Sequence, residues 1–229
     1  MPELHPILVA ALTGFISGLL LSIPVGPINL TIMNEGARRG FRWAALIGLG
    51  ASVMEVIYCA IAFTSFSAFF SDRYIKAGME LFTFVFMLVI GVKFLLAKSV
   101  SAPIHLSAAA DKLEVRIEGR LHPRSAFMTG LVRVMGNAGV LLFWIVLAAN
   151  FMSRDWVEPN YSSKFACVGG VALGTGVWFM GLSWTVSLGH RKFSETTLLR
   201  MERCSGVGLL TLALIHGGRI IWQLAKHKV

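Results

Sequence analysis

The chain has 229 residues, of which 55% are hydrophobic and only 14% are charged. Soluble domains carry about 25% charged residues, so this composition excludes an ordinary water-soluble fold and indicates a membrane protein. The formal net charge is +9. Because most basic residues lie in short segments between long apolar runs, we interpret them as topology signals and anionic-lipid contacts, not as a nucleic-acid surface.

Six apolar stretches are each long enough to cross a bilayer as a helix. They cover residues 7–33, 43–70, 75–96, 126–149, 165–188 and 206–224. Little sequence is left outside them, which excludes a separate soluble catalytic domain. We therefore predict one all-α domain over residues 1–229, an integral membrane bundle of six transmembrane helices. A cytoplasmic loop, 97–124, separates the first half, 1–96, from the second half, 125–229, and a short interfacial helix is expected from residue 194 to residue 203.

The distribution of basic residues predicts the orientation of this bundle. Twelve Lys and Arg residues lie in the loops after the first, third and fifth stretches, against six at the opposite ends. Loops rich in Lys and Arg stay in the cytoplasm, so both termini are expected to face outward. The first six residues contain Glu3 and no Lys or Arg, so no cleavable signal peptide is expected.

One carboxylate, Glu55, lies deep inside the second apolar stretch. An ionisable group at that depth costs about 2.5 kcal/mol or more, and chains carry one there for a partner, a water-filled cavity or a transported species. Glu55 could bind a substrate ammonium or cation, carry a coupling proton, or form a structural ion pair with Arg133 of the fourth stretch. Arg133 could instead bind a substrate carboxylate or extend to the headgroups. The two charges together would suit a zwitterionic amino acid.

The first apolar stretch contains two prolines, Pro24 and Pro27, on either side of Val25 and Gly26. Each proline lacks a backbone N–H and crowds the preceding turn, so we expect the helix to kink or unwind there. Irregular backbone at membrane depth is tolerated only where protein or water meets it. We therefore predict a substrate site at Pro24, Gly26, Pro27 and Asn29, although a proline-kinked helix that only packs well is the alternative.

The fourth stretch resembles the first. Phe15, Gly18 and Leu19 reappear 112 positions later as Phe127, Gly130 and Leu131, and a glycine-rich segment around Asn137 follows where the first stretch has its prolines. We expect a milder break there, with Asn137 lining the same site. Because each half has three stretches, an odd number, the second half must be inverted relative to the first. This is the inverted-repeat plan of many secondary transporters.

The three cysteines, Cys59, Cys167 and Cys204, lie far apart and form no Cys-x-x-Cys pair. We interpret them as packed residues. No His, Cys, Asp and Glu spacing resembles a ligand set, so no metal or other cofactor is expected.

The chain resembles the lysine exporter (LysE/RhtB) family of bacterial translocators. The residues that carry the resemblance are Pro24-Val25-Gly26-Pro27, Gly36-Ala37-Arg38-Arg39-Gly40-Phe41, Gly48-Leu49-Gly50-Ala51 with Glu55, and Asn137 with Phe143-Trp144. The resemblance implies a six-helix exporter of amino acids or related small cationic or zwitterionic metabolites, driven by the proton gradient across the bacterial inner membrane. This chain has Asn137-Ala138-Gly139 where the family has Asn-Pro-Lys, so it lacks that proline and that cation.

Two other classes of function compete with the transporter interpretation. A membrane-embedded enzyme or electron carrier would need a nucleophile and base, a metal set or a cysteine pair, and the sequence offers none of these. A membrane accessory subunit would use Glu55 and Arg133 only to pair helices. The sequence leaves open the substrate (lysine, arginine, threonine, a homoserine-like compound or an inorganic cation), and it is compatible with a homodimer.

Overall fold

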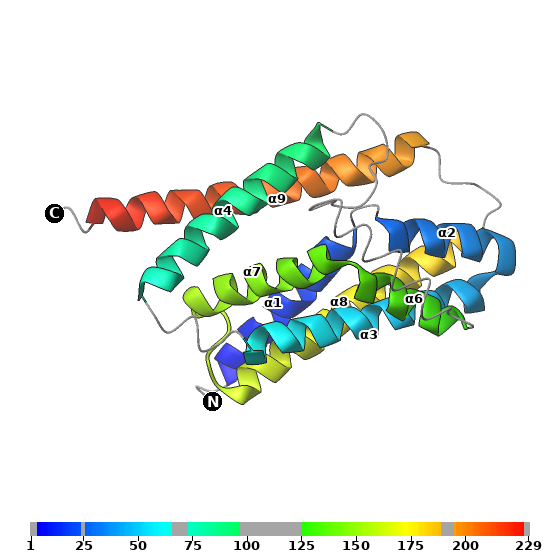
Figure 1. Cartoon of the computed structure of the whole chain (residues 1–229), viewed down its shortest axis with the longest axis horizontal. Helices are drawn as coiled ribbons and strands as arrows, with labels where there is room; N and C mark the ends of the chain where they lie inside the picture. The colour runs from blue at the N-terminus through cyan, green and yellow to red at the C-terminus, as the bar shows by residue number, and fades with distance from the viewer. Residues whose placement is uncertain (1–3, 24–25, 66–72, 97–124, 189–194, 227–229) are drawn as a thin grey trace.

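The computed structural model describes residues 4–23, 26–65, 73–96, 125–188 and 195–226. Within these ranges the regular secondary structure is all helix, without strands (Figure 1), which confirms the all-α prediction. The helices are α1 (Leu4–Ser22), α2 (Pro27–Arg39), α3 (Phe41–Ser65), α4 (Arg73–Leu95), α6 (Ala126–Gly136), α7 (Ala138–Ser153), α8 (Tyr161–Leu188) and α9 (Glu195–Lys226). Pro24 and the predicted loop 97–124 lie outside the described residues.

Three of the described helices are long and apolar enough to cross a membrane. They are α1, α3 and α8, over His5–Ser22, Phe41–Thr64 and Tyr161–Leu188. The α6–α7 pair would make a fourth span if the two helices cross together. The sequence-based count of six spans therefore goes beyond what helix length and composition establish.

The predicted interruption of the first apolar stretch is confirmed. Helix α1 ends at Ser22, and α2 begins at Pro27 with Gly26 as its N-cap. Proline is favourable at the first position of a helix because its fixed φ suits the helix and its missing N–H would have no partner there. The helix after the break is more polar than the one before it, because α2 carries Glu35, Arg38 and Arg39, whereas α1 is apolar.

The second interruption is sharper than the sequence suggested. Helices α6 and α7 meet at Asn137 with a bend of 68°. Asn137 supports both helices, because its backbone N–H donates to the Val134 carbonyl at 3.0 Å and its Oδ1 accepts from the Gly139 N–H at 3.0 Å. An asparagine cap of this kind ends one helix and starts the next without a proline.

Glycines allow very close helix packing at two interfaces, α1 with α8 and α3 with α6. A Cβ added at Gly130 of α6 would clash with the Ile47 carbonyl of α3, and one added at Gly50 of α3 would clash with the Phe127 carbonyl of α6. The α1–α8 interface has the same arrangement. There Gly18 and Gly174 face the carbonyls of Val171 and Phe15, respectively. Small residues of this kind let membrane helices approach backbone to backbone.

Helices α4 and α9 form a pair that lies along one side of the other helices (Figure 1). Gly91 and Gly206 lie at their interface, since an added Cβ at Gly91 would clash with the Leu210 side chain and one at Gly206 would clash with the backbone of Leu95. Helix α9 is continuous from Glu195 to Lys226. The prediction of a separate interfacial helix over 194–203 is therefore wrong, because the polar turns before residue 206 extend the same helix.

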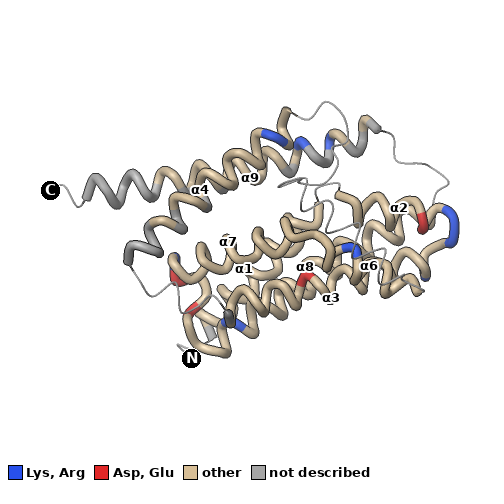
Figure 2. Tube along the Cα trace, viewed as in Figure 1, with Lys and Arg blue, Asp and Glu red and all other residues tan. Residues whose placement is uncertain are grey.

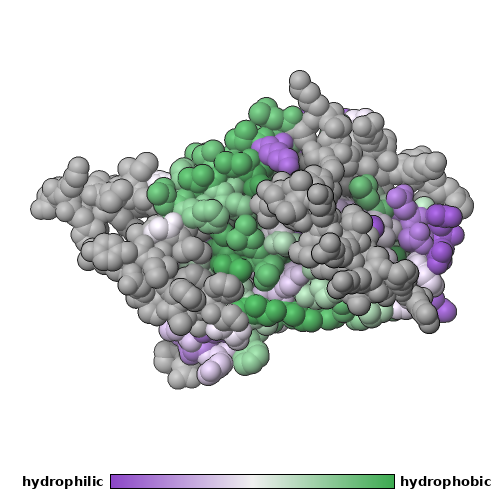
Figure 3. Space-filling view, viewed as in Figure 1, coloured by the Kyte–Doolittle hydropathy of each residue, from purple (hydrophilic) through white to green (hydrophobic). Residues whose placement is uncertain are grey.

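Charged and apolar side chains divide along the long axis of the molecule. Basic residues of the α2–α3 connection gather at one end (Figure 2), and an apolar band crosses the middle of the face in Figure 3. Large exposed apolar side chains include Leu8 on α1, Val85 on α4 and Leu173 on α8. Exposed apolar side chains along several helices, bounded by charge, are what acyl chains would cover.

Candidate functional site

A cavity of about 700 Å³ lies where the two helix breaks meet the α4–α9 pair. One part of its wall comes from the breaks themselves, through Gly26, Pro27, Asn29 and Asn137. The rest comes mainly from α1, α4, α7 and α9, and Glu55 of α3 also lines it. Its volume is in the range of small-molecule sites in proteins, and its walls are mostly apolar with a few polar groups, as is usual for such sites.

Glu55 is a buried carboxylate, with 6% of its surface exposed. Trp144 of α7 donates a hydrogen bond from its indole Nε1 to Glu55 Oε2 at 2.7 Å. Both residues line the cavity. Because a tryptophan N–H is a neutral donor, it orients the carboxylate without neutralising its charge. The arrangement therefore holds an acidic group at the cavity wall, ready to meet a cation or a proton.

Backbone carbonyls at both helix breaks are satisfied by side chains from neighbouring elements. Asn29 donates from Nδ2 to the Ser22 carbonyl at the end of α1, at 2.8 Å, and accepts from Trp178 Nε1 at 3.2 Å. Tyr58 donates from its hydroxyl to the Met135 carbonyl at the end of α6, at 2.7 Å. The last carbonyls of a helix have no partner within it, so these bonds stabilise the broken conformation.

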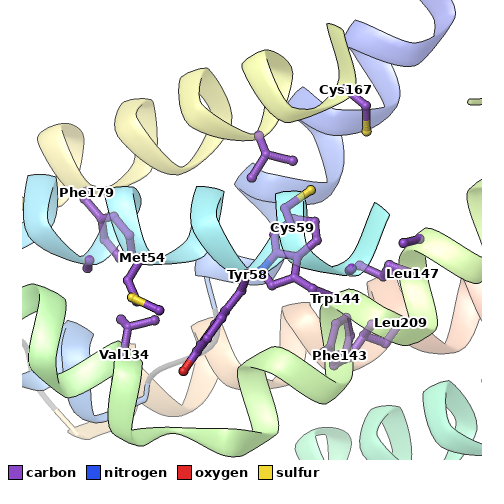
Figure 4. Close-up of a cluster of buried hydrophobic side chains, with 14 of the residues drawn as sticks. Met54, Tyr58, Cys59, Val134, Phe143, Trp144, Leu147, Cys167, Phe179 and Leu209 are labelled. Atoms are coloured by element: carbon purple, nitrogen blue, oxygen red, sulfur yellow. The ribbon is translucent and has the colours of Figure 1, made fainter. Parts of the chain in front are cut away.

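Figure 4 shows how the second break meets the helix that carries Glu55. Tyr58 extends from α3 toward the α6–α7 pair, and Trp144 of α7 belongs to the same buried cluster as Cys59 of α3. Cys59 and Cys167 are buried in this cluster as free thiols. Packed side chains from α3, α7 and α8 therefore support the cavity wall around Glu55.

The predicted site residues divide between two cavities. Glu55, Gly26, Pro27, Asn29 and Asn137 all line the large cavity.

Arg133 lines a second, smaller cavity of about 400 Å³ between α2 and α6. There its Nη1 donates a hydrogen bond to the Thr31 hydroxyl. The same cavity holds an ion pair of 3.0 Å between Arg39 and Glu35. Glu55 and Arg133 therefore line separate cavities. In this structure they are not placed to bind the same substrate molecule together.

Comparison with known proteins decides the family. The model of the LysE type translocator family matches residues 19–216. The chain belongs to the LysE type translocator family. The matched region covers both helix breaks, Glu55 and Trp144, so the resemblance predicted from the sequence motifs is confirmed.

This LysE type translocator is also similar to a protein of Bacillus subtilis (strain 168) that bears the name "Putative amino acid efflux protein YcgF". The two are 25% identical over 213 residues, which is 93% of this chain and 97% of the relative. No solved structure matches the chain. Members of the family are multi-pass membrane transporters, and this translocator is accordingly a transport protein and not an enzyme.

Trp144 is the site residue of this translocator that sequence reasoning missed as a functional group. The only signal was the adjacent pair Phe143-Trp144, which carried the family resemblance. Nothing in the spacing links position 144 to position 55, because they lie on different helices and meet only through the bend at Asn137. Contact between them depends on tertiary packing.

Replacing Trp144 with Phe is expected to lower transport by about tenfold while the protein still folds. The ring keeps most of the packing, but Glu55 loses its donor, which costs about 1–3 kcal/mol for a buried polar group. Efflux rates in proteoliposomes, together with the elution profile in size-exclusion chromatography, measure the two effects separately. Wild-type efflux from the variant would contradict a role for the indole N–H.

Proposed function

We propose that this protein exports amino acids across the bacterial inner membrane. The single observation that carries the proposal is the buried carboxylate of Glu55 at the wall of a 700 Å³ cavity to which both broken helices contribute. The family match and the name of the Bacillus subtilis relative support an amino acid as the substrate.

In the proposed complex, the substrate ammonium binds the Glu55 carboxylate. An ammonium offers three donors, and a charge-assisted hydrogen bond to a carboxylate is about twice as strong as a neutral one. The substrate carboxylate lies toward the first turn of α2, whose N-cap, Gly26, has no side chain to cover the free amides. Half-helix N-termini of this kind carry partial positive charge and bind anionic substrate groups in other transporters. Asn137 lines the opposite break.

Export is proposed to be coupled to proton entry at the same carboxylate. A proton and a substrate ammonium compete for Glu55, so binding of one displaces the other. A group that alternates between the two, in a cavity open to one side of the membrane at a time, exchanges a proton for each substrate molecule. Proton antiport therefore requires no second titrating residue.

We propose that the chain crosses the membrane six times as two inverted halves of three helices, with both termini outside. The glycine contacts support this. Gly130 of α6 faces the Ile47 carbonyl of α3, just as Gly18 of α1 faces the Val171 carbonyl of α8. In the same way, Gly50 of α3 faces the Phe127 carbonyl of α6, and Gly174 of α8 faces the Phe15 carbonyl of α1. In both pairs of contacts, the α6 residue lies 112 positions after its α1 counterpart, and the α8 residue lies 124 positions after its α3 counterpart. In the third helices, α4 and α9, Gly91 faces Leu210 and Gly206 faces Leu95, and each α9 residue lies 115 positions after its α4 counterpart, although these contacts are not with the leucine carbonyls.

Arg133 is proposed to act at the cytoplasmic side, between α2 and α6. Its hydrogen bond to Thr31 joins these two helices on the side of the basic α2–α3 connection. Opening of the cavity toward the cytoplasm would have to separate α2 from α6, so the bond between Arg133 and Thr31 would break in that state. Arg133 would then meet an incoming substrate carboxylate.

The experiment that tests the proposed function is efflux from proteoliposomes under an imposed pH gradient. Purified protein is reconstituted, the vesicles are loaded with individual radiolabelled amino acids, and release is followed with and without the gradient. At least one amino acid is expected to leave several-fold faster than from protein-free vesicles, and collapse of the gradient with an ionophore should slow it. Flat release for every compound would contradict the proposal and favour the accessory-subunit alternative.

A further inference from the structure

The walls of the large cavity differ in character along its length. Glu55, Asn29 and Asn137 lie at the end formed by the helix breaks, and Arg154 and Trp156, just after α7, lie at the other end. Between them the wall is mostly apolar, and Thr13, Ser17 and Asn150 are its polar members. The apolar part includes Leu12, Ile16 and Leu20 of α1, Met87 and Phe94 of α4, and Phe143, Leu147 and Phe151 of α7.

The charges that line the cavity are few. Among the described lining residues, the acidic side chain is Glu55 and the basic side chain is Arg154. The guanidinium of Arg154 stacks on the Trp156 ring, 4.9 Å from its centroid, at the far end. One carboxylate can neutralise one ammonium, and the α-ammonium group of any amino acid already requires it. A second positive charge on the substrate would enter a mostly apolar wall with no further carboxylate among the described lining residues, which is strongly unfavourable.

We propose that the substrate is a neutral amino acid with a bulky apolar side chain, and not lysine or arginine. This inference rests on the proposed function, since it names the substrate class of the same cavity. The side chain lies against Leu147 and Phe143 on one wall and Ile16 on the other, while the backbone groups stay at the polar end near Glu55. Apolar contact area then supplies the selectivity.

The test is a comparison of efflux rates from proteoliposomes that hold the wild-type protein. Leucine, phenylalanine and methionine are expected to leave at least ~10-fold faster than lysine or arginine at equal internal concentration. Lysine efflux equal to or faster than leucine efflux would overturn the substrate class and leave the proposed export function standing. No efflux of any compound would overturn the proposed function itself, so the two failures are distinguishable.

A variant pair tests whether the apolar wall contacts the substrate side chain. Ile16 lines the cavity and is 51% exposed, so a polar group there does not enter a packed core. Ile16→Glu supplies a second carboxylate and is expected to raise the lysine-to-leucine rate ratio by about tenfold or more relative to Ile16→Gln, which changes polarity without charge. Equal ratios in the two variants would show that this wall does not meet the side chain and would overturn the assignment.

Discussion

Glu55→Gln is expected to reduce transport at least ~100-fold while leaving the protein folded and inserted. The amide has nearly the same shape as the carboxylate, and its oxygen can still accept the hydrogen bond from Trp144 Nε1, which measures 2.7 Å in the wild-type protein. The amide cannot, however, attract an ammonium or take up a proton at physiological pH. Loss of a charged partner in a low-dielectric site costs about 3 kcal/mol or more, which is the basis of the expected factor.

The measurement combines efflux rates with thermal unfolding in detergent. Glu158→Gln is the matched control, because Glu158 bonds Asn160 in the connection before α8 and lies outside both cavities. The control should transport at the wild-type rate. If Glu55→Gln transports normally, the coupling role is wrong; if it unfolds instead of merely losing transport, Glu55 is a structural residue and the accessory-subunit interpretation gains support.

Gly130→Ala is expected to destabilise the protein by about 3 kcal/mol, the upper end of the usual cost of overpacking. The new methyl group would overlap the Ile47 carbonyl of α3, which is backbone and cannot turn aside, so α3 and α6 would have to separate. Gly50→Ala should have the same effect from the other helix, because its methyl group would overlap the Phe127 carbonyl. Thermal unfolding in detergent and the yield of monodisperse protein measure the loss.

Gly176→Ala provides the matched control for the glycine prediction. Gly176 lies inside α8, yet an added Cβ there meets no atom within 4 Å. Since alanine favours a helix interior by about 1 kcal/mol over glycine, this variant should be neutral or slightly stabilised. If all three variants behave alike, close backbone packing does not determine stability, and the support that these contacts give to the inverted repeat disappears.

The helix breaks show what local sequence can predict. Pro24, Gly26 and Pro27 predicted the first interruption because proline and glycine act through their own backbone, and α2 does begin at Pro27. The second break had no proline, so its 68° bend was underestimated. There the Asn137 side chain replaces a backbone hydrogen bond at Gly139. Whether an asparagine caps a helix or lies in its middle depends on neighbours such as Tyr58, which satisfies the carbonyl left free at Met135.

Pairing of charges was harder to predict than their presence. The sequence shows that Glu55 and Arg133 each lie within an apolar stretch, but position along a helix does not say which way a side chain points. In the structure Glu55 lines the large cavity with Trp144, and Arg133 lines the smaller one with Thr31. The rotation of each helix about its own axis decides this, and packing against neighbouring helices sets that rotation.

By itself, the sequence determined the membrane class, the helical fold, the first break and the family, because composition, proline chemistry and motif order are properties of neighbouring residues. Only the tertiary structure decided that Trp144 meets Glu55, that Arg133 lies apart, and that an apolar wall follows the polar end of the cavity. The Trp144–Glu55 and Arg133–Thr31 hydrogen bonds join residues 89 and 102 positions apart. Their contacts depend on glycine-mediated helix packing and on the bend at Asn137, which fix distances that no local pattern records.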